Sequence, residues 1–267
     1  MDILLHVVVA ALYAAAAWLC RPHAEPAPSR TTRTAAIAVA LGVHAVVIGR
    51  AIVTREGLDL SFLHALSLVA GLSVLVAWLS GALRILPGVA SMILPVAAFC
   101  ALLPAFSRTA HRVAYADAPW ATAHISVSLI AYALFVVAAM QAVVLTGVEQ
   151  RLHRGAPLPE ARDDTPPLLT LERYLFRLIG AAFVLLTIAV ISGVFFSEEL
   201  FGKPASFTHK IVLTVAGWLV FAILLFGRWR YGWRGRTALK WILGGTLLLV
   251  LGYLGSKFVL EVLLKRG

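Results

Sequence analysis

The sequence predicts an all-α, polytopic transmembrane helix bundle of about eight spans, built as one integral-membrane domain over residues 1–267. The chain is 61% hydrophobic and only 13% charged, about half the charged fraction of a soluble domain. Its mean hydropathy of +0.90 indicates many apolar segments and not a single anchor. The longest connection, at residues 148–173, is rich in proline and has the composition of an exposed linker.

Eight apolar segments are each long enough for a membrane-spanning helix, which needs ~20 residues. Arg84, Pro87 and Gly88 lie in a very short connection, so the third and fourth segments are expected to form an antiparallel hairpin. Pro95 and Pro104 predict kinks in the fourth. The first lacks a preceding basic region and is therefore expected to stay as a span. The segments cover residues 3–20, 35–53, 62–81, 88–106, 122–147, 174–196, 210–227 and 241–262.

The distribution of basic residues predicts the orientation. Basic loops tend to remain in the cytoplasm. With eight spans, alternate loops share one side, and 14 of the 23 basic residues fall there, so both termini are expected outside. The +10 charge is explained by these loops, and no nucleic-acid partner is expected. The 14 residues are Arg21, Arg30, Arg33, Arg84, Arg151, Arg154, Arg162, Arg173, Arg177, Arg228, Arg230, Arg234, Arg236 and Lys240.

Little in the sequence points to catalysis. No nucleophile–base pair, phosphate-binding loop or carboxylate pair is visible in the loops, so we expect a protein that is not an enzyme. The two cysteines, Cys20 and Cys100, are far apart and form no Cys-x-x-Cys pair. They are expected to be buried apolar thiols.

Two histidines open apolar segments that enter the membrane from the same predicted side. His124 lies near the start of the fifth segment and His209 just before the seventh, with His64 at a similar depth. Each can be a packed, hydrogen-bonded residue or a metal ligand. Two imidazoles on facing helices suit bis-histidine coordination of haem (heme) iron. Zinc usually takes further ligands, which show no motif spacing here, so haem is the stronger interpretation for His124 and His209.

Aromatic and hydroxyl side chains accompany these histidines. His124, Ser128 and Tyr132 recur at every fourth residue and therefore share one helix face. Phe196 and Phe207 belong to an aromatic connection that could hold a flat apolar ligand or form an ordinary interfacial belt. The candidate cofactor-binding residues are thus His124, His209, Tyr132, Phe196 and Phe207.

The last apolar segment carries small residues and a charged pair. Gly244, Gly245, Gly252 and Ser256 predict a close-packed helix face. Lys257 and Glu261 are spaced to pair within the helix, at a depth where snorkelling to the interface is expected.

Several runs resemble the cytochrome c assembly protein family, which includes haem-handling membrane proteins and HemX-like relatives. The His…Ala-Tyr run from His124 to Phe135 looks like that family's signature. The resemblance covers roughly residues 60–265 and is strongest from residue 121 onward. It implies a location in the bacterial inner membrane and a haem cofactor. The other matching runs are Leu171–Arg173, Gly193–Gly202, Trp218–Phe226, Tyr231–Arg236 and Gly252–Glu261.

The chain also departs from the haem-exporting members of that family. They carry a tryptophan-rich motif that lays haem on an outer aromatic shelf, whereas residues 202–209 contain no tryptophan. Phe226 and Gly227 stand where the synthetase relatives are expected to have a histidine. The resemblance therefore implies a haem-associated protein that binds haem between helices on the outer side. The alternative is a haem-free accessory or regulatory protein that packs against another membrane protein, such as an ion transporter.

Overall fold

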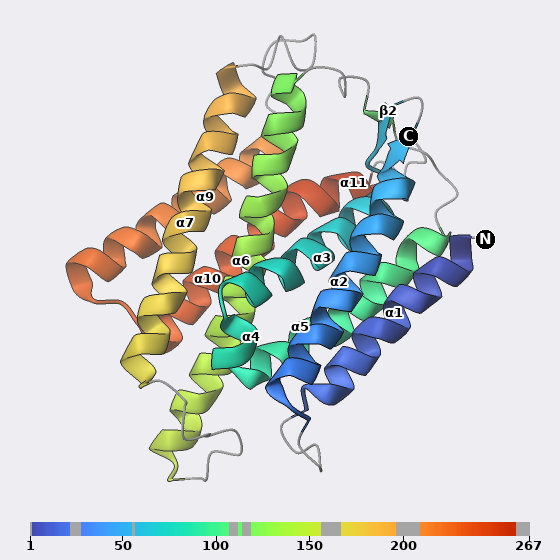
Figure 1. Cartoon of the computed structure of the whole chain (residues 1–267). Helices are drawn as coiled ribbons and strands as arrows, with labels where there is room; N and C mark the ends of the chain where they lie inside the picture. The colour runs from blue at the N-terminus through green and yellow to red at the C-terminus, as the bar shows by residue number, and fades with distance from the viewer. Residues whose placement is uncertain are drawn as a thin grey trace.

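The computed structural model confirms an all-α membrane bundle (Figure 1). It describes residues 2–21, 28–54, 57–106, 112–113, 119–155, 167–195 and 209–259. Seven of its helices are long and apolar enough to cross a membrane, and a shorter apolar helix covers Ile3–Leu19. The seven and the shorter helix correspond one for one to the eight predicted segments.

The helices follow the chain as two groups, and a small sheet pairs two strands from the α2–α3 connection with one strand that precedes α6. The N-terminal group comprises α1 (Asp2–Leu19), α2 (Arg30–Ile52), α3 (Phe62–Leu79), α4 (Ala82–Ile85), α5 (Pro87–Leu102) and the 3-10 helix η1 (Leu103–Phe106). The C-terminal group comprises α6 (Pro119–His153), α7 (Leu168–Phe195), α9 (His209–Tyr231), α10 (Gly235–Val250), the π-helical η2 (Leu251–Gly255) and α11 (Ser256–Phe258). The antiparallel sheet joins β1 (Val53–Thr54), β2 (Gly57–Asp59) and β3 (Arg112–Val113) in that order.

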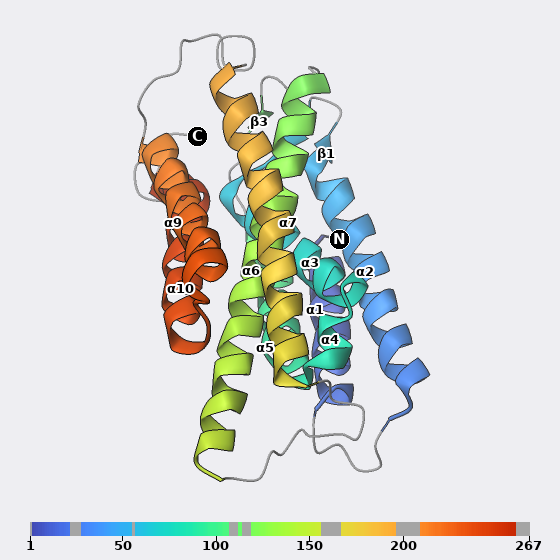
Figure 2. The same cartoon turned by 90° about the vertical axis from the view of Figure 1, so that its left-hand side faces the viewer.

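The start of α1 and the end of α11 lie at the same end of the bundle, together with the starts of α3, α6 and α9 (Figures 1 and 2). We call this the His124 end. The opposite end holds the α3–α5 hairpin turn, the end of α6 and the α9–α10 turn, and we call it the arginine end. Arg84 lies in α4 within the α3–α5 turn, and Arg151 and Arg228 lie in the last turns of α6 and α9.

Some predicted boundaries were wrong. The prediction began the sixth segment at residue 174, but α7 starts at Leu168 and includes Glu172 as a buried residue. The connection before it is shorter than predicted, since α6 continues to His153. Local composition suggested a loop because charges interrupt the apolar run, yet Glu172 pairs with Arg228 from α9, which lies far away in the sequence.

The N-terminal group packs around buried polar contacts. The imidazole of His44 hydrogen-bonds the Tyr13 hydroxyl at 3.0 Å through Nδ1 and the Ser67 hydroxyl at 3.0 Å through Nε2. Gly71 makes room for this ring, since a Cβ there would lie 2.8 Å from it. The His6 ring bonds the carbonyl of Ala101 at 2.9 Å. Such satisfied contacts tie α1, α2, α3 and α5 together, because an unpaired polar group in this environment is costly.

The C-terminal group packs through glycines, as predicted for part of its last span. A Cβ at Gly245 would lie 2.7 Å from the Phe221 ring, and one at Gly252 would lie 3.2 Å from Cβ of Leu213. These glycines let α10 and η2 approach α9 closely. Gly244 was wrongly included in the packed face, since a Cβ there would meet nothing within 4 Å.

Candidate functional site

His124 lies in the first turns of α6, where it faces α7. Its Nδ1 is 2.8 Å from the hydroxyl oxygen of Ser192 on α7, and the ring is half-buried. Gly193 leaves space for the imidazole, because a Cβ at Gly193 would lie 3.2 Å from Cε1. The histidine is therefore held between two helices at the His124 end.

The hydrogen bonds around Ser192 indicate which nitrogen of His124 carries the proton. The Ser192 hydroxyl donates to the carbonyl of Ala189 at 3.1 Å. A hydroxyl has one proton, so Ser192 accepts from Nδ1–H of His124. Nε2 then keeps its lone pair, which is the state of a histidine that can bind a metal.

The second predicted ligand, His209, is the first residue of α9 and is exposed. The starts of α6 and α9 lie at the same end of the bundle, so the predicted common depth is consistent with the structure (Figure 2). The structure records no contact between the imidazoles of His124 and His209. Phe196 and Phe207 fall outside the described residues, so their role as an aromatic platform remains a prediction.

Tyr132, on the same face of α6, is buried and stacks on Tyr253 of η2 with 5.5 Å between ring centroids. Two lysines lie over the Tyr253 ring: Nζ of Lys210 is 5.4 Å from its centroid and Nζ of Lys257 is 5.8 Å away. Lys257 also donates to the carbonyl of Leu60. Two ammonium groups therefore lie over one aromatic ring that stacks on Tyr132.

Three further histidines, His6, His44 and His64, are buried in the N-terminal group. Both ring nitrogens of His44 are engaged, and Nδ1 of His64 contacts the Ser61 hydroxyl at 2.6 Å and Asp59 Oδ2 at 3.7 Å. In the parts of the chain that the structure describes, no three His, Cys, Asp or Glu side chains form a cluster suited to a metal ion.

Comparison with known proteins identifies the family. The profile described as "Cytochrome C assembly protein" matches residues 34–264. The chain belongs to the cytochrome c assembly protein family. It is 32% identical over 145 residues to the "Inner membrane protein YpjD" of Escherichia coli (strain K12), covering 54% of each chain. No solved structure matches it.

Two further relatives extend the comparison within the cytochrome c assembly family. A protein of Azospirillum brasilense, "Uncharacterized 28.8 kDa protein in nifR3-like 5'region", is 37% identical over 145 residues, which cover 54% of this chain and 53% of that protein. The "Cytochrome c biogenesis protein CcsA" of Thermosynechococcus vestitus (strain NIES-2133 / IAM M-273 / BP-1) is 30% identical over 177 residues, covering 53% and 56%. The chain thus spans about half the length of the curated relatives it matches.

The sequence did not reveal what surrounds His124 in this family member. Ser192 and Lys210 lie on other helices, and no local spacing links them to residue 124. The one available signal was that Ser192, Gly193 and Lys210 all lie close to predicted ends of segments that reach the same side as His124.

Proposed function

We propose that this cytochrome c assembly family protein handles haem at the His124 end of the bundle and is not an enzyme. The tautomer of His124 carries the proposal: the Ser192 hydroxyl, which donates to the Ala189 carbonyl, accepts from Nδ1–H and leaves the Nε2 lone pair available for iron. His124 would be one residue that holds the iron, and His209, at the start of α9, is the candidate second. Bound iron would supply the redox and ligand-exchange chemistry of haem.

The surroundings of His124 suit the other parts of haem. The macrocycle is flat and apolar, and Gly193 leaves the space on α7 that is occupied by the imidazole that would hold it. Haem also carries two carboxylates. Lys210 and Lys257, both over the Tyr253 ring, would pair with them, because an ammonium group forms a charge-assisted hydrogen bond with a carboxylate. The histidines would thus hold and orient haem, and the two lysines would neutralise its carboxylates.

The proposed location follows from the basic loops and from the relatives. The arginine end would face the cytoplasm of a bacterium, so the His124 end would lie on the outer side of its inner membrane. The YpjD proteins of Escherichia coli carry the words "inner membrane" in their name. We also propose that the protein is related to the HemX-like branch of the family.

The alternative, a haem-free accessory protein that binds a partner through Gly252 and Ser256, is less well supported. Gly252 is buried against Leu213 and Thr214 of the same chain, and Ser256 donates to the Gly252 carbonyl at 2.8 Å. This face is used for internal packing. Substitutions there would report on folding before they reported on a partner.

Absorption spectroscopy tests the proposal. The protein purified in detergent from haem-replete cells should show a Soret band, and the His124→Ala/His209→Ala double variant should lose it. His153→Ala, at the exposed opposite end of α6, is the matched control and should keep the band. A haem-free preparation whose spectrum does not change when hemin is added would contradict the proposal.

A further inference from the structure

One exposed face of α9 changes from apolar to cationic at the arginine end. Apolar side chains follow one another on this face at spacings of three and four residues, and Arg230 continues the same spacing. Leu219 lies about 16 Å along the helix axis from Arg230, which is about half of a ~30 Å hydrocarbon core. The exposed apolar members of this stripe are Val215, Leu219, Ile223 and Phe226.

The neighbouring helix, α10, has a similar stripe in the reverse order along the chain. Arg236 and Lys240 lie in its first turns, and the exposed side chains of Leu243 and Leu247 continue their face. The end of α9 and the start of α10 meet at the arginine end (Figure 2). The cationic ends of the two stripes therefore flank the same turn.

The chain itself fixes the turn that joins α9 to α10. Gly232 and Gly235 have φ values of +67° and +56°, which glycine adopts without a steric cost. Trp233 packs closely on Gly227, where an added Cβ would clash with the indole ring. Arg228 donates to the Trp233 carbonyl at 3.1 Å. The arginines around this turn are thus carried by a defined backbone.

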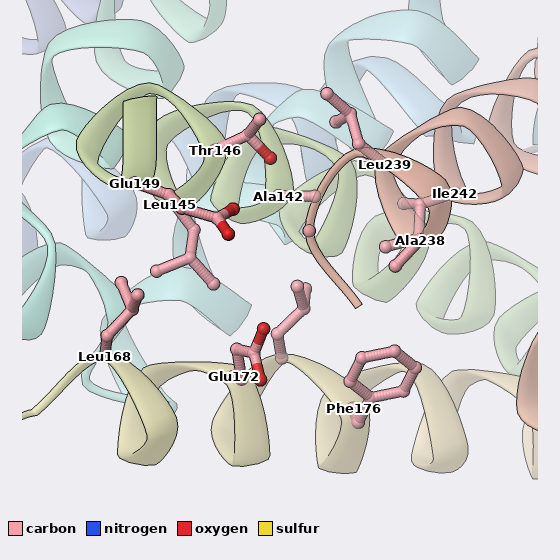
Figure 3. A pocket seen from close by; sticks show the side chains of 12 residues that line it. Ala142, Leu145, Thr146, Glu149, Leu168, Glu172, Phe176, Ala238, Leu239 and Ile242 are labelled. Atoms are coloured by element: carbon pink, nitrogen blue, oxygen red, sulfur yellow. The ribbon is translucent and has the colours of Figure 1, made fainter. Parts of the chain in front are cut away.

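The carboxylates nearest the turn lie on its inner side. Glu149 and Glu172 line a small pocket between α6, α7 and α10 (Figure 3). Glu172 pairs with Arg228, at 3.6 Å between Oε2 and Nη2. Within the part of the chain that the structure describes, no carboxylate pairs with the other four cations near the turn. These exposed cations are Arg230, Arg234, Arg236 and Lys240.

An amphiphile with an anionic head matches this arrangement. Guanidinium groups bind phosphate oxygens through charge-assisted and often bidentate hydrogen bonds. Trp229 and Tyr231 are 79% and 66% exposed, and such aromatic side chains are typical of the headgroup level of a membrane. A soluble acidic protein or a nucleic acid would reach the arginines but not the apolar stripes within the bilayer. A zwitterionic lipid would bring a cation of its own to this positive surface.

We infer that the α9–α10 turn binds an anionic phospholipid of the phosphatidylglycerol type. Its phosphodiester would lie at Arg230, Arg234 and Arg236, and its acyl chains would follow the apolar stripes of α9 and α10. This surface is at the opposite end of the bundle from His124 and is independent of the proposed haem function. Either proposal could fail while the other holds.

The probe is dioleoylphosphatidylglycerol, titrated into the purified full chain in a neutral detergent. Native mass spectrometry counts the bound lipids, and thermal unfolding follows stability. Saturable binding with a rise in Tm is expected, and dioleoylphosphatidylcholine should bind about tenfold more weakly. Sodium phosphate at the same phosphate concentration should not displace the lipid, because it has no acyl chains.

The Arg230→Gln/Arg234→Gln/Arg236→Gln variant removes the cations assigned to the phosphodiester. It should bind phosphatidylglycerol about tenfold more weakly than wild type. All three side chains are exposed, so the Tm without added lipid should stay the same.

The matched control is the Arg30→Gln/Arg151→Gln/Arg154→Gln variant. It removes the same charge at the arginine end, from the start of α2 and the end of α6, and should keep the wild-type affinity. Three results would overturn the inference. These are equal affinity of wild type for the two lipids, equal weakening in the two triple variants, or displacement of the lipid by sodium phosphate.

Discussion

At the scale of single residues, the site depends on how His124 is held. Its ring is fixed on one side by the Ser192 hydroxyl and lies against Gly193 on the same helix. A hydrogen bond on one imidazole nitrogen orients the other nitrogen toward a metal. Loss of such a hydrogen-bond partner commonly weakens metal binding about 10- to 100-fold. Small substitutions on α7 should therefore lower the ligand affinity more than they lower the stability of the fold.

Gly193→Ala tests this dependence. The new Cβ would lie 3.2 Å from Cε1 of His124, so the ring must shift by a few tenths of an ångström. We expect hemin affinity to fall several-fold, measured by titration at the Soret band, with little change in Tm. Gly180→Ala is the control on the same helix, because a Cβ there meets nothing within 4 Å. Equal hemin affinity in both variants would show that the position of His124 is unimportant.

At the scale of elements, the α9–α10 pair is held by close approach at glycine. Phe221 of α9 is fully buried, stacks on Phe135 of α6 at 3.9 Å between centroids, and also covers Gly245 of α10. Because three helices meet at this ring, it has little freedom to move. The packing of α10 on α9 therefore depends on the absence of a side chain at Gly245.

Gly245→Ala should destabilise the bundle. The added Cβ would be 2.7 Å from the Phe221 ring and 3.0 Å from Val220, and overpacking of this kind costs about 1–3 kcal/mol. Thermal unfolding in detergent should show a lower Tm. Gly244→Ala, the adjacent position with open space, should leave Tm unchanged or slightly raised. If the two variants unfold at the same temperature, the close packing of α10 on α9 is not what stabilises this pair.

At the scale of the whole molecule, α6 runs from the His124 end of the bundle to the arginine end. The predicted orientation assigns the His124 end to the outside and the arginine end to the cytoplasm. Cysteine labelling of α6 tests this directly. In a background without the buried Cys20 and Cys100, Trp120→Cys should react with a membrane-impermeant maleimide on intact cells.

The matching variant is His153→Cys, at the other end of the same helix. Its thiol should react only after the cells are permeabilised. Labelling of His153→Cys, but not of Trp120→Cys, in intact cells would reverse the orientation. The haem proposal would then apply to the cytoplasmic side.

Most of the fold could be predicted from the sequence because apolar length is a local property. Each predicted segment corresponds to a helix, and the α3–α5 hairpin forms where Gly88 and Pro87 indicated it. The start of α7 could not be predicted, since the charge of Glu172 is accommodated by Arg228 from α9. Within the site, the residue His124 could be chosen from its position, but its partner Ser192 could not, because that contact joins residues 68 positions apart.

The central claim is that Nε2 of His124 binds haem iron, and rescue by imidazole tests it most directly. His124→Gly should lose the Soret band given by wild type on addition of hemin. Free imidazole, which can occupy the vacated position, should restore the band in this variant. The control variant His153→Gly should bind hemin in the absence of imidazole. Hemin binding by His124→Gly that matches wild type in the absence of imidazole would contradict the claim.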